Sequence, residues 1–259
     1  MKTTTHLYNK TVPLEFDDDK HHYTIEGRTI DGVTSVLKIL DKPALIPWAV
    51  NQAVGYMDKN LPVGVALDEL QKKQLLDEAK KIYRKTASDA ADLGTLTHEW
   101  CEKWIKGMNP EMPTNEILRQ NAENFVKWAT EHKVDFKASE RKVYSKKHDY
   151  CGTADIFGRI DGRAFVGDIK TSSGIYDEML LQIAAYAGAV EEEFEISPES
   201  GIIIRCGKDG SFEIKEWSRA DLEAANEAFL GTLKVYRFLK NLKFNSKSNQ
   251  KSYGNNLNC

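Results

Sequence analysis

The sequence predicts an α/β (α+β) fold, in which a central mixed β-sheet is flanked by helices and preceded by a mainly helical N-terminal half. Two observations predict it. Residues 67–106 place apolar side chains at helical spacing between turns rich in Lys and Glu. Residues 141–171 hold three strand-like runs, the last two separated by the hairpin signal Asp161-Gly162, and helices and strands then alternate up to residue 242. Strands and helices in this order are typical of a mixed sheet covered by helices.

The N-terminal half is expected to begin with short strands and to continue as helices. Strand-like pieces stand among turn residues at 22–25 and 28–30. Thr34 or Ser35 can cap a helix that continues to residue 40, and Pro43 stops it. Further helices are expected at 47–57, 67–106 and 115–132, with breaks at 61–64 and 109–113.

The C-terminal half is expected to supply the sheet. Its expected elements are strands at 141–145, 152–160 and 163–171, a helix at 176–193, strands at 201–206 and 211–217, and a helix at 220–242. We expect a single domain over residues 1–259, made of the mainly helical half (1–135), an αβ core (136–244) and a flexible basic tail (245–259).

Composition and charge narrow the class of protein. The chain has 259 residues, 41% of them apolar and 29% charged, which excludes collagen-like, mucin-like and wholly disordered proteins. The net charge of −3 is unevenly distributed, because the last 31 residues carry six basic side chains and no acidic one. Net acidity therefore does not exclude a nucleic-acid partner, although a basic helix is more often a solvated surface.

The cysteines and the apolar pattern indicate the compartment. The four cysteines are far apart and form no CxxC pair, which suits reduced thiols. The N-terminal residues lack the apolar stretch of a signal peptide, and no apolar run approaches the ~18–20 residues that span a bilayer. We expect a soluble cytoplasmic protein with no membrane partner.

The stretch that carries chemistry is residues 152–173. Asp168 and Lys170 are two apart in an apolar strand and share a face with Val166. The hairpin at residues 161–162 brings Asp155 alongside them. Two carboxylates buried this close are costly unless a cation neutralises them, and their hard oxygens favour Mg²⁺ or Mn²⁺. The alternative for Asp168 and Lys170 alone is a surface pair on an exposed strand edge.

Four motifs in order carry a family resemblance. Asp155 followed by Asp168-Ile169-Lys170 resembles the D…(D/E)xK signature of the PD-(D/E)xK nuclease superfamily. The segment Gly94-Thr95-Leu96-Thr97-His98 resembles the GTxxH helix motif of its RecB-like and phage-exonuclease branch, and Gln182 with Tyr186 resembles its QxxxY motif. Glu140 matches a frequent upstream acid, and residues 33–48 are similar to the N-terminal region of phage-encoded members. The resemblance spans about residues 30–190.

This resemblance implies a restriction-endonuclease-like core and a metal-dependent site. One or two Mg²⁺ or Mn²⁺ ions would be held by His98, Asp155, Asp168 and the carbonyl of Ile169, and Lys170 would position or deprotonate the attacking water. The remaining catalytic residues implied are Glu140, which would complete a second metal position, and Gln182 and Tyr186, which would orient the ligands and the lysine. By itself, His98 would be read as a helix-surface histidine.

The resemblance also suggests contacts with DNA. Thr171, Ser172 and Ser173 follow the catalytic strand, where they are either turn residues or hydrogen-bond donors to a phosphate. Lys146 and Lys147 form a small basic loop that we expect beside the site. Trp48 on an N-terminal helix is a candidate for stacking on a base.

The function implied is a DNA exonuclease in phage or bacterial recombination, repair or replication, inside a bacterial or phage-infected cell. Its partners would be single-stranded DNA or duplex ends, together with a single-strand annealing or replication protein. Three alternatives stay open: an endonuclease of the same fold, a catalytically silent DNA-binding protein and a hydrolase of small phosphoesters. Iron–sulfur relatives need three clustered cysteines near the C-terminus, so we expect no iron–sulfur cluster here.

Overall fold

The computed structural model describes residues 2–254, except the side chains of residues 90 and 243–254. The strands are β1 (Lys2–Leu7), β2 (Val12–Asp17), β3 (His22–Ile25), β4 (Arg28–Gly32), β5 (Asp135–Ser145), β6 (Tyr150–Ile160), β7 (Arg163–Lys170), β8 (Ser200–Cys206) and β9 (Phe212–Ser218). The helices are α1 (Val33–Leu37), α2 (Leu45–Asn60), α3 (Glu69–Ile105), α4 (Glu116–Glu131), α5 (Asp177–Phe194) and α6 (Arg219–Gly254).

The strands form one mixed sheet, which confirms the predicted fold class. Its order is β1-β2-β3-β4-β6-β7-β8-β9, and β5 pairs with β6 outside this path. The pairs β4–β6 and β7–β8 are parallel, and the other pairs are antiparallel. The parallel β7–β8 pair needs a crossover, which α5 supplies as the sequence pattern indicates.

One edge of β6 has a notch, a gap in its strand pairing, and this gap positions the candidate functional site. β5 pairs with β6 along almost its whole length, from Ser145↔Tyr150 to Asp135↔Arg159. The other edge of β6 is shared, because β4 pairs with it at residues 150–151 and β7 pairs with it at residues 156–160. Residues 152–155 therefore lie in a gap between β4 and β7, where the backbone has no neighbouring strand on that edge.

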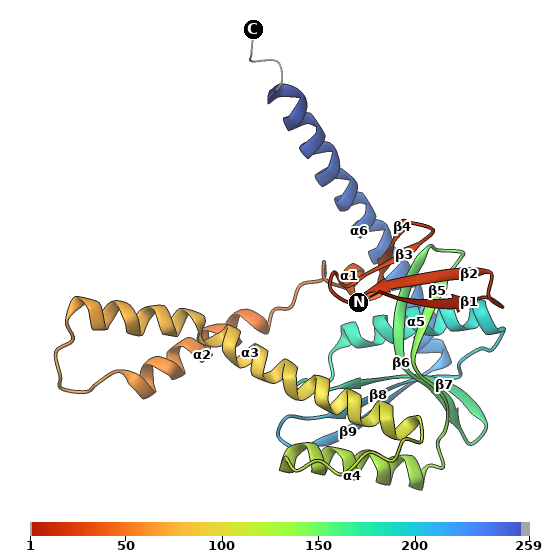
Figure 1. Cartoon of the computed structure of the whole chain (residues 1–259), viewed down its shortest axis with the longest axis horizontal. Helices are drawn as coiled ribbons and strands as arrows, with labels where there is room; N and C mark the ends of the chain where they lie inside the picture. Colours follow the sequence, from red (N-terminus) through yellow and green to blue (C-terminus); the bar gives the residue numbers. More distant parts are fainter. Residues whose placement is uncertain (1, 255–259) are drawn as a thin grey trace.

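Helices cover both faces of the sheet and enclose two apolar cores (Figure 1). Strand β7 shows how the alternation of side chains builds them. Val166 packs into the core shared with α1, α5 and α6. Phe165 and Ile169 pack into the core shared with α3 and α4. A charged residue on β7 is thus enclosed on either face, and Asp168 is 1% exposed.

A helical arm projects away from the sheet. It consists of α2 and the N-terminal part of α3, which lie side by side at a distance from the rest of the molecule (Figure 1). No residue of α2 is buried, and Ile46 on it is 73% exposed. α3 begins at a capping box in which Asp68 and Gln71 satisfy each other's backbone N–H groups. Among the described residues, no helix combines the length and apolarity needed to cross a bilayer.

Three expectations about the elements differ from the structure. The strands β1 and β2 were not expected, and they complete an antiparallel meander with β3 and β4 over residues 2–32. The helix expected to reach residue 40 ends at Leu37, and its N-cap is Gly32 without a side-chain hydrogen bond. The expected tail from residue 245 continues α6 as far as Gly254, and residues 255–259 lie outside the described part of the chain.

Candidate functional site

Asp155 and Asp168 lie at the point where β6 and β7 separate. The antiparallel pairing of these strands ends at Ile156↔Gly167, so the two aspartates come directly after the last pair. The backbone N–H of Ile169, which no longer faces β6, donates a hydrogen bond of 2.9 Å to Oδ2 of Asp155. The sequence prediction that the hairpin brings both carboxylates together is therefore met by the geometry.

His98 and Glu140 approach Asp155 from two other elements. Nδ1 of His98, on α3, lies 3.3 Å from Oδ2 of Asp155. Glu140 lies opposite Asp155, because its neighbours on β5 pair with the neighbours of Asp155 on β6. Its φ of 52° is in the left-handed region, where the regular strand is interrupted. One donor atom from each of these three side chains lies within 4.8 Å of the other two.

Asp168 has a separate set of partners. Its Oδ2 forms an ion pair with Nζ of Lys170. Nε2 of Gln182, on α5, donates to Oδ1 of Asp168 (3.1 Å), and Oε1 of Gln182 accepts from Lys170 (3.2 Å). Nε2 of Gln182 also lies 3.0 Å from the hydroxyl oxygen of Tyr186, one turn further along α5. Gln182 therefore fixes the relative positions of the carboxylate and the ammonium.

Tyr186 reaches this network through a close approach to β6. A Cβ atom on Gly152 would lie 2.5 Å from Cε1 of Tyr186, so any larger residue would displace the buried ring. The hydroxyl group of Tyr186 can then meet Gln182 in the gap between β4 and β7. Gly152 is thus needed for the close packing of α5 on the sheet.

The electrostatics of the cluster suit a bound cation. Burial raises the pKa of the Asp155 carboxyl well above its ordinary value, and the neighbouring charge of Asp168 raises it further. Burial and the nearby Glu102 raise the pKa of Glu140 in the same way. Burial lowers the pKa of His98, which favours the neutral imidazole that can ligate a metal. A divalent ion would relieve the repulsion between the carboxylates, and this donor set of oxygens and one imidazole nitrogen fits Mn²⁺ or Mg²⁺.

The pKa of the Lys170 ammonium group lies above its ordinary value. Burial lowers the pKa of the ammonium group, but the adjacent Asp168 and Asp155 outweigh that effect, and the net shift is upward. In this arrangement Lys170 is a stable cation.

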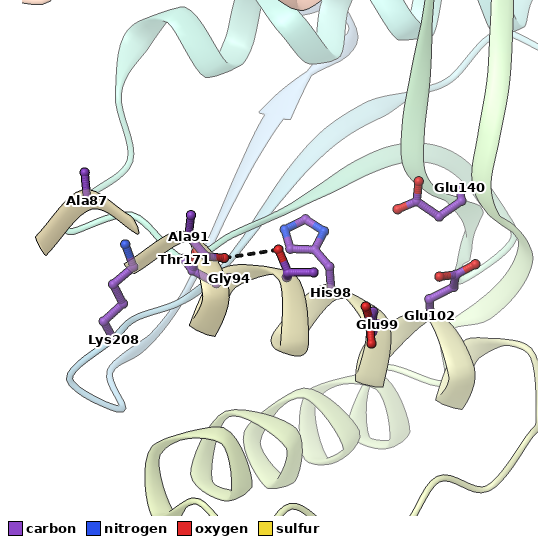
Figure 2. Close-up of a pocket in the computed structure, with 10 residues that line it drawn as sticks. Ala87, Ala91, Gly94, His98, Glu99, Glu102, Glu140, Thr171 and Lys208 are labelled. Carbon is purple, nitrogen blue, oxygen red and sulfur yellow. Dashed lines mark hydrogen bonds between the residues drawn. The ribbon is translucent and has the colours of Figure 1, made fainter. Parts of the chain in front are cut away.

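An open groove of about 550 Å³ leads to the cluster (Figure 2). One wall is the face of α3 that carries Gly94, His98 and Glu102, and Glu140 and Thr171 come from the sheet. A Cβ atom on Gly94 would lie 2.8 Å from Oγ1 of Thr171, so the glycine lets α3 approach the end of β7.

The residues expected to contact DNA near β7 divide into two groups. Thr171 lines the groove. The hydroxyl of Ser172 donates to the carbonyl of Gly174 (2.7 Å), and that of Ser173 lies 2.7 Å from the hydroxyl of Tyr176. The two serines are thus hydrogen-bonded within their own loop.

Three other residues that were expected to contact DNA do not lie near the cluster of His98, Glu140 and Asp155. Trp48 is on α2, in the helical arm, and does not line the groove. The ammonium of Lys146 lies 3.9 Å from the ring centroid of Tyr8, and the backbone N–H of Lys147 donates to Glu192. The β5–β6 turn therefore packs against the N-terminal meander and the end of α5, instead of lying beside the site, as expected from the sequence.

Sequence reasoning missed several residues of this region. Lys208, in the turn between β8 and β9, lines the groove opposite α3. Lys142 pairs with Thr153 in the β5–β6 register, two residues along each strand from Glu140 and Asp155. The period of two along a strand could have found Lys142 and Thr153, because each is two residues from a proposed ligand. The Gly207–Gly210 turn gives no comparable signal for Lys208.

Comparisons with known proteins add structural likeness only. No protein-family model and no curated protein match the chain. A crystal structure from Eubacterium rectale described as "Putative exonuclease" is 13% identical, with a TM-score of 0.39, covering 78% of this chain and 87% of that one. An alkaline exonuclease from Laribacter hongkongensis is 12% identical, with a TM-score of 0.31, covering 61% of this chain and 92% of that one. Likenesses at this level assign this chain neither a family nor an activity.

Proposed function

We propose that this protein is a Mg²⁺- or Mn²⁺-dependent deoxyribonuclease of the PD-(D/E)xK type, with one nuclease domain spanning residues 1–259. The observation that carries the proposal is the pairing of two clusters at the base of one groove. His98, Glu140 and Asp155 converge within 4.8 Å, and the network of Asp168, Lys170 and Gln182 adjoins them. A cation site beside a buried, oriented ammonium suits attack on a phosphodiester.

Each residue has a role in this proposal. His98, Glu140, Asp155 and the carbonyl of Ile169 would hold an ion, and the free side of Asp168 would complete its shell. Such an ion supplies Lewis-acid stabilisation and a bound water of lowered pKa. Lys170, held by Gln182, would orient the attacking water and balance negative charge at the phosphate. Tyr186 would keep Gln182 in place.

DNA is the proposed substrate because the groove is open. A hydrolase of small phosphoesters would be expected to enclose its substrate, whereas this groove is open and extends along α3 from Ala87 to Glu102. Exonuclease action on strand or duplex ends, in recombination, repair or replication, follows from the motif resemblance. A single-strand annealing or replication protein is the proposed partner.

The test is cleavage of single- and double-stranded DNA labelled at either end, with Mg²⁺, Mn²⁺ or EDTA. We expect metal-dependent release of mononucleotides or short oligonucleotides. Asp168→Asn should lower the rate at least about 100-fold, because it removes the charge that pairs with Lys170. The matched control is Asp161→Asn, which changes an exposed aspartate in the turn at the other end of the same hairpin.

The outcomes separate the alternatives. Cutting of a closed circular DNA would favour an endonuclease. Retention of DNA without cutting, with either metal, would indicate a catalytically silent binding protein. Full activity of Asp168→Asn would show that the proposed site is wrong.

A further inference from the structure

Next to the proposed metal ligands lies a cation that the mechanism does not use. Lys142 on β5 pairs with Thr153 on β6, one same-face step from the position where Glu140 lies opposite Asp155. Two residues along a strand span about 7 Å. The distance is of the order of the spacing between neighbouring phosphates on an extended nucleic-acid strand. Lys142 therefore lies about one phosphate spacing along the strand from the proposed ligand Glu140.

The ammonium group of Lys142 is held but not neutralised. Nζ donates a hydrogen bond of 3.0 Å to Oγ1 of Thr153 and lies 4.5 Å from the ring centroid of Phe16. Within the described part of the chain it forms no ion pair, and an ammonium has three donors. A half-buried cation with unused donors beside a groove favours an anionic ligand.

The N-terminal meander supplies aromatic rings beside this cation. The rings of Phe16 and Tyr23 lie 4.6 Å apart with an interplanar angle of 37°, and the Phe16 ring lies 6.2 Å from that of His21. The hydroxyl of Tyr23 lies 2.8 Å from that of Thr153, which ties the meander to β6. These rings line a second hollow of about 180 Å³. Partly exposed rings beside a lysine are the combination that single-stranded nucleic-acid sites use for base and phosphate.

We propose that Lys142 binds the phosphate next to the scissile one and that Phe16 and His21 form a shelf on which the flanking base stacks. This inference rests on the proposed nuclease function and defines where the substrate strand continues from the metal site. Thr153 orients Lys142, and Tyr23 fixes the shelf against the sheet. The ligand class is a single-stranded deoxynucleotide segment.

The acidic turn after β2 is compatible with this path. Asp17 is buried and accepts hydrogen bonds from the backbone N–H groups of Asp19 and Lys20, so its charge is directed into the turn. Asp18 is exposed and acts electrostatically on Lys142. Its charge competes with a phosphate for the lysine. Asp18→Asn should therefore tighten DNA binding.

The test measures binding of a labelled single-stranded oligonucleotide by fluorescence anisotropy in EDTA, over a series of salt concentrations. Lys142→Met keeps the aliphatic stem and removes the charge. We expect about tenfold weaker binding, and a salt slope that falls by about 0.7, as for the loss of one phosphate contact. Lys142→Arg should restore both. Phe16→Leu should weaken binding with the slope unchanged.

The matched control is Lys146→Met. Lys146 also lies over an aromatic ring of the meander, that of Tyr8, but it is in the β5–β6 turn, four residues further than Lys142 from the proposed ligand Glu140. A purely structural role of Lys142 would lower the melting temperature of Lys142→Met without changing its salt slope, and Lys146→Met should leave the salt slope unchanged. The slope therefore distinguishes a phosphate contact from packing.

The outcomes for this site and for the nuclease function are distinguishable. If the wild-type protein cleaves DNA while Lys142→Met binds it with wild-type affinity and slope, the inference is wrong and the nuclease stands. If DNA is bound through Lys142 but never cut, the binding site stands and the nuclease function is wrong. A wild-type protein that neither binds nor cuts DNA overturns both.

Discussion

Asp155 and Asp168 are carboxylates on neighbouring strands, yet their surroundings give them different tasks. Asp155 faces His98 and Glu140, and Asp168 is tied to Lys170 and Gln182. The side chain of Asp168 is 2% exposed and that of Asp155 is 13% exposed. The more accessible carboxylate thus faces His98 and Glu140, and the enclosed one is paired with the lysine.

The raised pKa of Asp155 predicts a stability difference that depends on pH. A carboxyl group whose folded pKa lies above its unfolded value stabilises the fold fully below the unfolded pKa, and this contribution is lost as pH rises through the folded pKa. With the metal removed, the raised pKa of Asp155 therefore makes the fold less stable as pH rises above the ordinary value of this carboxyl. In EDTA, Asp155→Asn should melt above the wild-type protein at pH 8, and the difference should vanish near the ordinary value of 3.8.

Thermal melts from pH 4 to pH 8 in EDTA check this expectation. Asp161→Asn is the control, because Asp161 is exposed in the turn of the same hairpin. A melting temperature of Asp155→Asn at or below the wild-type value at pH 8 would contradict it.

At the scale of elements, α6 uses basic side chains to dock and not only to present charge. Nε of Arg237 lies 2.8 Å from Asp31 on β4, and its two Nη atoms donate to the carbonyls of His148 and Asp149 in the β5–β6 turn. Lys240 forms a second ion pair with Asp31 (2.7 Å). The basic excess of the C-terminal region is therefore partly structural, which net charge could not indicate.

Replacing Arg237 should cost stability without changing the chemistry. Arg237→Met removes one ion pair and two hydrogen bonds to backbone carbonyls, and we expect the free energy of unfolding to fall by about 1–2 kcal/mol, because the side chain is partly exposed and screened. Denaturant unfolding measures this change. Lys234→Met, an exposed change one turn earlier on α6, is the control and should alter stability little.

The rate of DNA cleavage per folded molecule should be the same for Arg237→Met and the wild-type protein. An equal loss of stability in Lys234→Met and Arg237→Met would show that the contacts with Asp31 and the turn contribute nothing specific.

Helix α3 connects the core that it shares with α4 to the helical arm that it forms with α2. Its C-terminal part carries His98 and packs Trp100 and Cys101 into the core with α4. Its N-terminal part forms the arm with α2, beyond the edge of the sheet (Figure 1). A single helix of 37 residues thus positions a proposed metal ligand rigidly relative to the arm.

At the scale of the whole molecule, the net charge of −3 combines a basic C-terminal region with an acidic site. The acidic site is unfavourable for folding when it holds no cation, since burial raises the pKa values of Asp155 and Glu140. A cation that binds only the folded protein stabilises it by mass action, by about 2.7 kcal/mol at 100 times its Kd.

Metal binding should therefore be visible as a shift of the melting temperature. Saturating Mn²⁺ should raise the wild-type value by about 5–10 °C, and EDTA should reverse the shift. Glu140→Gln should lose most of this increase, whereas Asp161→Asn should keep it. The absence of any shift with Mn²⁺ or Mg²⁺ would mean that His98, Glu140 and Asp155 do not form a cation site.

The elements that were predicted correctly are those with a strong local pattern in the sequence. The helical period predicted α3 and α4, and the Asp161-Gly162 turn predicted the β6–β7 hairpin and hence the meeting of Asp155 and Asp168. The first two strands were missed, although Val12, Leu14 and Phe16 alternate with polar or turn residues. Short strands are stabilised by their neighbours more than by their own residues, which makes such a signal weak.

By itself, the sequence predicted the residues proposed to carry the chemistry, and it determined that Asp155 and Asp168 would meet on the two strands of one hairpin. Only the tertiary structure decided that Glu140 and His98 group with Asp155, that Lys170 belongs to Asp168, and that Lys142 lies beside them while Lys146 and Trp48 do not. The physical reason is the range of the interactions. Helices, turns and the alternation along a strand depend on neighbours in sequence. The notch in β6 depends instead on where β4 and β7 pair with it, and β4 is far away in the sequence, since Gly32 pairs with Cys151.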